Sequence, residues 1–396
     1  MLGIKLSQLR KLDPFATSRT STDCLLVLLA MDTLSDKAAT SGAHQLKLFI
    51  EGDELYQSML DEISSAQHSV LLESYIFTCD EIGERFINAF IERASAGIDV
   101  RVNLDAAGSK FLISRNQFQR LRKSNVTFHW FHRWSWRKPH RYNRRNHRKL
   151  LVIDRHTAFV GGFNIHRESS LDIYGTQRWR DSHVRIEGML AEHAAQLFEH
   201  FWQGEYRWHP PSVTSQHDQL MPNNTYKHQF YFRSMLETMF NSAKQSIYLT
   251  TPYFVPDRKT QHLLQFAARK GIDVRLLVPR KNDIKIARWA AHAAYDGLLS
   301  SGVRIYEYLP RMLHSKTIIV DGNYATLGTA NIDYRSFFLN YELNFFSYNS
   351  DFCQKLQELF LDDLKDSDEI FLHQWKYRFW GNKVLEFIGW LARRLL

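Results

Sequence analysis

An unusual octet of residues occurs twice in this chain and constrains the fold more than any other feature. The first copy, residues 147–154, is HRKLLVID, and the second, residues 314–321, is HSKTIIVD. Each copy is followed by a second short apolar stretch and then by a glycine turn that ends in asparagine, GGFN at 161–164 and GTAN at 328–331. A chain that carries the same pattern twice is predicted to be an internal duplication.

The spacing inside each octet predicts that its histidine and lysine act together. His147 and Lys149 in the first copy are two residues apart, as are His314 and Lys316 in the second. In an extended strand such residues project from the same face, whereas the residue between them points away. Both side chains of a pair can therefore reach one ligand.

The residues that follow each pair predict a rigid support for it. Residues 150–153 and 317–320 form short, mainly apolar runs. Such runs are typical of strands buried on both faces. Asp154 and Asp321 end the two predicted strands.

The glycine turns add an anion-binding signal. Glycine lets the backbone approach an anion closely, and Asn164 and Asn331 contribute amide donors. One site built from both copies would offer two imidazoles, two ammonium groups and two amides to a tetrahedral anion, which indicates a phosphodiester site. The alternative for a single octet is a core strand with a surface histidine and lysine, and the matching second copy disfavours it.

The duplication extends beyond the octets and predicts the fold class. Ser-Met-Leu at 58–60 recurs at 234–236, and Gly-Ile-Asp-Val-Arg at 97–101 recurs at 271–275. Strands and helical patterns alternate in each half, as is typical of an α/β sheet covered by helices on both faces. Because ligands of such sheets bind at the strand ends, the two halves are expected to meet there.

Composition narrows the class of protein. A length of 396 residues with 44% apolar content is that of a globular protein with room for two domains. Cys24, Cys79 and Cys353 are scattered, which argues against a disulfide framework or a structural zinc. The sequence contains no run of 18 or more apolar residues, so no membrane-spanning helix is predicted. The net charge of +9 predicts an anionic partner, either nucleic acid or an anionic membrane surface.

These motifs carry a family resemblance. The pattern His-x-Lys-x4-Asp followed by Gly-Gly/Thr-x-Asn, present twice, resembles the phospholipase D superfamily, and GTANIDYRSFFLNYELN at 328–344 is similar to bacterial cardiolipin synthases within it. The resemblance runs from about Leu46 to about Leu364. It implies two pseudo-two-fold-related phospholipase-D-like α/β/α sandwich lobes with the active site at their interface.

The domain organisation follows from the repeat and the resemblance. Residues 1–44 are expected to be a poorly structured leader, 45–210 the first phospholipase-D-like lobe, and 225–366 the second. Residues 367–396 are expected to form an amphipathic helix that can lie at a membrane interface, with packing on the second lobe as the alternative.

The chemistry predicted for the site uses the two histidines and no metal, because no metal-ligand spacing is present in the sequence. His147 is predicted to attack phosphorus and become a phosphatidyl-histidine, while His314 protonates the departing alcohol and then activates the incoming one. The pseudo-symmetry allows these roles to be exchanged. Lysine and asparagine would neutralise the phosphoryl oxygens. The predicted catalytic residues are His147, Lys149, Asp154, His314, Lys316 and Asp321, with Asn164 and Asn331 as phosphate-binding residues.

Two carboxylates complete the predicted site. In the family resembled here, a carboxylate some twenty residues past each octet aspartate holds the inner nitrogen of a histidine. Asp181 and Glu342 occupy the matching positions, although either could also be an ordinary strand-edge carboxylate. The motif after Asn164 departs from expectation, since Ile165-His166-Arg167-Glu168 stands where more acidic and tyrosyl residues are expected.

The two halves also differ at the mouth of the site. Residues 130–148 are rich in Trp, Arg, His and Lys and are expected to contact anionic headgroups, or to form a solvated basic loop. Residues 306–312 lack this density of charge. Two non-equivalent mouths are expected if two different substrates or leaving groups are handled.

The resemblance implies a phosphatidyltransferase of the cardiolipin synthase type, acting on phosphatidylglycerol in phospholipid biosynthesis without a cofactor. Its implied partners are anionic phospholipid and the membrane surface, at the cytoplasmic face of the bacterial inner membrane. A hydrolytic phospholipase D and a phosphatidylserine-synthase-like enzyme are the near alternatives. A nuclease of the superfamily, with the aromatic and basic stretch as a single-strand groove, and a non-catalytic lipid-binding scaffold are the others.

Overall fold

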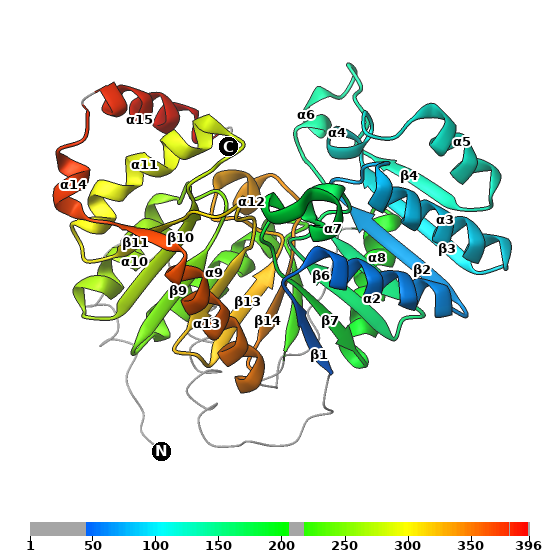
Figure 1. The fold of residues 1–396 in the computed structure, drawn as a ribbon, viewed down its shortest axis with the longest axis horizontal. Helices are drawn as coiled ribbons and strands as arrows, with labels where there is room; N and C mark the ends of the chain where they lie inside the picture. Colours follow the sequence, from blue (N-terminus) through cyan, green and yellow to red (C-terminus); the bar gives the residue numbers. More distant parts are fainter. Residues whose placement is uncertain (1–44, 206–217, 380, 395–396) are drawn as a thin grey trace, which may run out of the picture. The chain divides into compact units, whose positions relative to one another are not determined.

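The structure, a computed structural model, describes residues 45–205, 218–379 and 381–394. Within these ranges the chain forms two lobes, each built around one mixed β-sheet, with seven strands in the first sheet and eight in the second (Figure 1). The predicted α/β fold class is confirmed. The predicted leader, residues 1–44, lies outside the described residues.

The first lobe has the strand order β1-β7-β6-β5-β2-β3-β4. Neighbours β2, β3 and β4 are parallel, whereas the other pairings are antiparallel. The strands are β1 (Leu46–Phe49), β2 (Ser69–Ser74), β3 (Asp99–Asp105), β4 (Thr127–Phe131), β5 (Leu150–Ile153), β6 (Thr157–Gly161) and β7 (His183–Glu187). The helices are α2 (Gly52–Ser65), α3 (Glu81–Ser95), α4 (Ala106–Ser109), α5 (Arg115–Lys123), α6 (Pro139–Tyr142), η2 (Arg167–Ser169), α7 (Leu171–Tyr174), η3 (Gly175–Gln177) and α8 (Met189–Trp202).

The second lobe repeats this order, read from the other edge, as β15-β11-β10-β9-β12-β13-β14-β8. The strands are β8 (Gln219–Pro222), β9 (Ser246–Thr250), β10 (Asp273–Pro279), β11 (Arg304–Tyr308), β12 (Thr317–Val320), β13 (Tyr324–Gly328), β14 (Leu343–Ser347) and β15 (Ser367–Ile370). The helices are α9 (Tyr226–Ser242), α10 (Arg258–Arg269), α11 (Lys285–Leu299), α12 (Tyr334–Phe338), α13 (Ser350–Lys365), α14 (Leu372–Lys376) and α15 (Gly381–Ala392). Each first-lobe strand has a counterpart in the second sheet, which adds β15 at one edge. The predicted duplication is therefore visible strand by strand.

Strands β5 and β12 are the apolar halves of the two octets. All four residues of each strand are buried, as the sequence predicted. Each strand lies inside its sheet, β5 between β6 and β2 and β12 between β13 and β9. The histidine and lysine of each octet directly precede its strand. A rigid, buried strand therefore fixes the position of each pair.

The octet aspartates stabilise turns at the far ends of these strands. Asp154 and Asp321 both adopt positive φ, at 50° and 53°. Each carboxylate accepts three backbone N–H groups from the segment that leads into the neighbouring strand, namely Gln67, His68 and Ser69 for Asp154 and Lys244, Gln245 and Ser246 for Asp321. The aspartates thus tie the end of one strand to the start of the next.

One hydrophobic core joins the lobes. It contains side chains of both sheets together with buried faces of α8 and α13, and β6 and β7 contact β13 directly. A second core lies between the first sheet and helices α2, α3 and α5, and a third between the second sheet and α9, α10 and α11. The lobes therefore share a packed interface, and the octets reach the edge of that interface.

The C-terminal segment differs from the single helix expected over 367–396. Its first residues form β15, which pairs with β11, and Trp375 of α14 is buried in the core of the second lobe. Helix α15 packs on α11, where a Cβ at Gly389 would overlap with the backbone of Ala290. Strands β8 and β15 also extend the second lobe beyond the predicted 225–366. None of the helices in the described ranges is long and apolar enough to cross a membrane.

Candidate active site

A short backbone pairing connects the first octet to the second lobe. The N–H of His147 donates to the Tyr341 carbonyl at 2.9 Å, and the Tyr341 N–H donates to the Arg145 carbonyl at 2.8 Å. This parallel bridge sets Glu342, the next residue in the chain, beside the imidazole. His147 Nδ1 lies 2.8 Å from Glu342 Oε2.

The same pairing recurs for the second octet. The N–H of His314 donates to the Arg180 carbonyl at 2.7 Å, and the Arg180 N–H donates to the Met312 carbonyl at 2.8 Å. Asp181, the next residue, then meets the imidazole, with 2.5 Å between His314 Nδ1 and Asp181 Oδ2.

The pairing of histidines and carboxylates is crossed between the lobes. Glu342 of the second lobe holds His147 of the first, and Asp181 of the first lobe holds His314 of the second. A carboxylate on Nδ1 keeps the proton there and leaves Nε2 as the nitrogen available for chemistry. Each octet histidine is therefore paired with a carboxylate of the other lobe and not with one of its own.

The two carboxylates are buried but kept ionised. Burial alone would raise the pKa of Glu342, yet His147, Lys149 and the Thr329 hydroxyl, which donates to Oε2 at 2.6 Å, hold it below its usual value. Ser336 donates to the other carboxylate oxygen at 2.9 Å. Glu342 is therefore fixed in both charge and orientation.

Asp181 is stabilised in a different way. Burial again opposes ionisation, but Lys316 and His314 together hold the pKa of Asp181 below its usual value. The N–H of Ser182 donates to Oδ1 at 2.8 Å. A Cβ at Gly162 would overlap with this carboxylate, so the first glycine turn makes room for Asp181, whereas Thr329 at the matching place donates a hydrogen bond.

The two lysines are buried next to their histidines. Lys149 Nζ donates to the His147 carbonyl at 2.8 Å, and Lys316 Nζ lies 2.8 Å from His314 Nδ1 and also donates to the His314 carbonyl. Burial, together with the charge of Lys316, lowers the pKa of Lys149 to about 7, and burial lowers that of Lys316 to about 8. Because the charge of Lys316 acts on Lys149, an anion bound near both ammonium groups would favour their charged forms.

Both histidines are biased toward the neutral form. Burial lowers the pKa of His147, and burial with the charge of Lys316 lowers the pKa of His314 to about 3. A neutral imidazole with a free Nε2 can attack phosphorus, and negative charge from a bound phosphodiester would favour protonation of its partner. The arrangement can therefore supply a nucleophile and an acid.

The predicted phosphate-binding asparagines are buried in the turns that follow β6 and β13. The Asn164 amide oxygen accepts the Ile76 N–H at 3.2 Å. Its NH₂ group is therefore the part of the amide that could donate to a phosphate. The Asn331 N–H donates to Ser336 Oγ at 3.0 Å, and its amide oxygen has no hydrogen-bond partner within the described ranges. Their role toward a phosphate stays a prediction.

The structure does not bring Asp154 and Asp321 to the histidines. Each follows the last residue of its octet strand, whereas the histidine and lysine precede the first. Since these strands are fully extended, the aspartates lie at the opposite end of the element. Their observed contacts are with turn backbone, as described above.

Two aromatic rings that the sequence analysis did not assign flank the histidines. The Tyr75 ring lies 4.9 Å from the His147 ring, and the Trp179 ring lies 5.1 Å from the His314 ring. Trp179 is two residues before Asp181, so strand periodicity could have placed both on one face. Tyr75 follows β2 directly, at the edge where ligands of such sheets bind.

The unexpected His166 in the first lobe is held in place. Its Nδ1 lies 2.6 Å from Glu168, and its ring packs edge-on against Trp179 at 5.1 Å. Across the described ranges no group of three or more His, Cys, Asp or Glu residues is arranged to hold a metal ion.

The chain matches a known family over most of its length. A family model described as cardiolipin synthase, PLD-like domain, matches residues 59–202 and 236–364. The chain belongs to this family. One matched segment lies in each lobe and each contains one octet, so the site described above lies between the two copies of the family's domain.

Named relatives in this family are similar over nearly the whole chain. A cardiolipin synthase of Geobacillus thermodenitrificans is 36% identical over 371 residues, which are 89% of this chain and 73% of the relative. A cardiolipin synthase of Clostridium perfringens strain SM101 is 32% identical, covering 89% of this chain and 77% of the relative. Cardiolipin synthase 2 of Bacillus anthracis is 36% identical, covering 86% and 69%.

Solved structures confirm the fold. Phosphatidylserine synthase of Haemophilus influenzae superposes with a TM-score of 0.70 at 15% identity, covering 94% of this chain and 100% of that one. Polyphosphate kinase of Porphyromonas gingivalis gives a TM-score of 0.59 at 13% identity, covering 83% and 49%. At these identities the similarity describes the two-lobed architecture.

Proposed function

We propose that this protein is a phosphatidyltransferase of the cardiolipin synthase type, which joins a phosphatidyl group from one phosphatidylglycerol to the headgroup hydroxyl of another and releases glycerol. The observation that carries the proposal is the crossed arrangement of two buried histidines, each held at Nδ1 by a carboxylate of the other lobe. The named relatives, which are cardiolipin synthases, support the choice of reaction.

In the first step, Nε2 of His147 attacks the phosphorus of the donor lipid. The bond between phosphorus and the glycerol oxygen breaks, and protonated His314 gives its proton to that oxygen. Lys149 and Lys316 stabilise the negative charge on the phosphoryl oxygens as it builds up. The products of this step are free glycerol and a phosphatidyl group on His147.

In the second step, His314 accepts the proton of an incoming hydroxyl, whose oxygen attacks the same phosphorus. The bond between phosphorus and His147 breaks, and both histidines return to their starting forms. If the hydroxyl belongs to phosphatidylglycerol the product is cardiolipin, whereas water as acceptor gives phosphatidic acid. Exclusion of water from a buried site therefore decides between transfer and hydrolysis.

We also propose that the protein works at an anionic membrane surface. Helix α15 packs on α11 with one face but leaves apolar side chains such as Phe387 and Leu391 more than half exposed. The loop between β4 and α6 exposes Trp134 and Trp136 beside Arg133 and Arg137. Tryptophan and basic side chains are typical of surfaces that lie in the headgroup region.

The proposal can be tested with pure protein and vesicles of phosphatidylglycerol. Mass spectrometry of the lipid products should show cardiolipin, with glycerol released in equal amount. Phosphatidic acid as the main product would identify a hydrolase instead. Formation of neither lipid, together with cleavage of single-stranded DNA, would replace the proposal with a nuclease.

A further inference from the structure

A charged groove lies in the second lobe beside His314. Its volume is about 700 Å³, and its lining includes Trp179, Met312 and Trp289 of α11. Trp179 connects the groove to the site, since its ring also packs against the His314 imidazole at 5.1 Å. Met312 is two residues before His314. The groove therefore lies next to the histidine that is proposed to handle the leaving and incoming alcohols.

The segment between β10 and α11 gives the groove its charge. Four cations, Arg280, Lys281, Lys285 and Arg288, and one carboxylate, Asp283, lie in its lining. Asp283 is engaged by the hydroxyl of Tyr253 at 2.7 Å. The side chains in the lining thus carry an excess of positive charge, which suits a phosphodiester.

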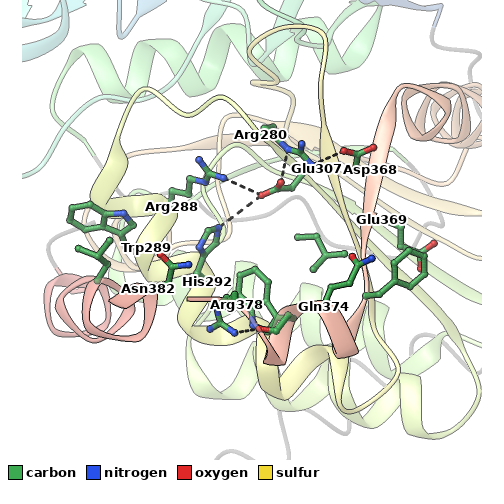
Figure 2. Close-up of a pocket in the computed structure, with 14 residues that line it drawn as sticks. Arg280, Arg288, Trp289, His292, Glu307, Asp368, Glu369, Gln374, Arg378 and Asn382 are labelled. Carbon is green, nitrogen blue, oxygen red and sulfur yellow. Dashed lines mark hydrogen bonds and ion pairs between the residues drawn. The ribbon is translucent and has the colours of Figure 1, made fainter. Parts of the chain in front are cut away.

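The two arginines of the groove pair with carboxylates that do not line it. Figure 2 shows Arg280 and Arg288 directed at Glu307, at 2.7 and 3.6 Å, and Arg280 also paired with Asp368. These carboxylates line a neighbouring cavity of about 700 Å³, which shares both arginines with the groove and in which acidic and basic side chains balance. Their pairing fixes the guanidinium groups and leaves other N–H donors on each arginine.

The two lysines, in contrast, have no acidic partner in the described part of the chain. Both are exposed, and neither forms an ion pair within 4 Å in the described part of the chain. Lys281 Nζ lies 3.0 Å from the Gln177 amide oxygen of the first lobe, a neutral partner. Lys281 and Lys285 therefore supply the uncompensated charge of the groove.

The matching positions of the first lobe lack the basic residues of this groove. Aligned on the repeated Gly-Ile-Asp-Val-Arg, Asp105 stands opposite Pro279, and Ala106 and Ala107 stand where Arg280 and Lys281 follow in the second lobe. Asp105 turns its carboxylate onto the local N–H of Ala107 at 2.8 Å. The basic residues that directly follow β10 are thus a property of the His314 side.

We propose that this groove binds the phosphodiester of the acceptor lipid, so that the headgroup hydroxyl of an anionic phospholipid is delivered to His314. The inference rests on the proposed phosphatidyl transfer. The departing glycerol and water carry no charge, whereas an acceptor phosphatidylglycerol brings its own phosphate. Lys281 and Lys285 therefore select an anionic lipid over water and small neutral alcohols in the second step, and leave the first step unchanged.

The test uses two competing acceptors. Full-length protein is given vesicles of phosphatidylglycerol together with ethanol, and the ratio of cardiolipin to phosphatidylethanol is measured by mass spectrometry. In the double variant Lys281→Gln/Lys285→Gln the ratio should fall about 30-fold, since about 1 kcal/mol for each of the two lysines near an anionic group corresponds to a change of that size. Total glycerol release should change by less than about twofold, and Lys281→Arg/Lys285→Arg should restore the ratio.

A matched variant controls for the loss of overall charge. Lys244→Gln/Lys355→Gln removes two exposed lysines of the same lobe that do not line the groove, and it should leave the ratio unchanged. The inference is overturned if the groove variant keeps the wild-type ratio, if the control lowers it equally, or if glycerol release falls with the ratio constant. A wild-type protein that forms no cardiolipin would instead refute the proposed function itself.

Discussion

Each octet histidine contacts a carboxylate of the other lobe. The backbone pairing of His147 with Tyr341 and of His314 with Arg180 places the following residue, Glu342 or Asp181, beside the imidazole. The two imidazoles also share their electrostatic surroundings, since Lys316 lowers the pKa of both. They should therefore behave as a single functional unit. In such a unit the loss of one member costs nearly as much as the loss of both.

We accordingly expect His147→Ala and His314→Ala each to reduce turnover by at least about 10²-fold, with the double variant little worse. Thermal unfolding should stay close to wild type, because both side chains line a polar site rather than a core. Steady-state kinetics and circular dichroism measure the two effects. A single variant that keeps more than about a tenth of wild-type turnover would contradict the shared site.

The buried lysines predict that anion binding takes up protons. Burial lowers the pKa of Lys149 to about 7 and that of Lys316 to about 8, and an oxyanion between them favours the charged forms. The bound pKa values are then higher than the free ones, so affinity should fall as pH rises through about 7 to 9.

Calorimetry with tungstate in buffers of different ionisation enthalpy measures this uptake, since tungstate itself does not titrate near neutral pH. Lys149→Gln should reduce the number of protons taken up. Binding without proton uptake at pH 8, or uptake unchanged in that variant, would show that the lysines are already fully charged.

At the scale of elements, the octet combines residues of the site with an aspartate that stabilises a turn. Histidine and lysine precede β5, while Asp154 follows it and holds three N–H groups of the turn before β2. The backbone N–H groups and the charge of His68 outweigh burial and hold the pKa of Asp154 below its usual value. Its contribution to stability is present above the unfolded pKa and is lost as pH falls through the folded one.

We expect Asp154→Ala to lower the free energy of unfolding by about 3 kcal/mol, as three backbone hydrogen bonds to a charged group are lost, with kcat within about twofold of wild type at 25 °C. Urea denaturation at pH 7 measures the first quantity. The difference from wild type should shrink at acidic pH. If instead kcat falls by about 10²-fold with stability unchanged, Asp154 has the catalytic role that its place in the motif suggested.

The sequence predicted those elements that depend on local pattern. Continuous apolar runs gave β5 and β12, and the repeated motifs revealed the two matching sheets. The strand β15 was missed because Ser-Asp-Glu-Ile has no strong strand pattern, and its pairing with β11 depends on tertiary context. The contact of His147 with Glu342 across the lobes could not be predicted from local sequence for the same reason, since it joins residues 195 positions apart.

At the scale of the whole molecule, α15 belongs to the second lobe and also presents an apolar face. Trp375 and β15 are parts of the core and the sheet, so removing the C-terminal segment would damage the fold. Figure 1 shows α15 and α6 on the same side of the described body, with α7 and α12 between them. The exposed tryptophans near α6 and the apolar face of α15 could thus meet one membrane surface.

Point substitutions on that face separate docking from folding. Phe387 and Leu391 are each 58% exposed, and transferring two such side chains into a bilayer interface is worth about 3 kcal/mol in total. We expect Phe387→Gln/Leu391→Gln to weaken binding to phosphatidylglycerol vesicles by about 100-fold in a flotation assay. Activity on bilayers should fall, whereas activity on short-chain, water-soluble phosphatidylglycerol should stay near wild type. Phe266→Gln, which removes a 51% exposed ring from α10, should change neither quantity. Equal loss of activity on both forms of lipid, or a lower unfolding temperature, would mean that this face of α15 serves the second lobe and not the membrane.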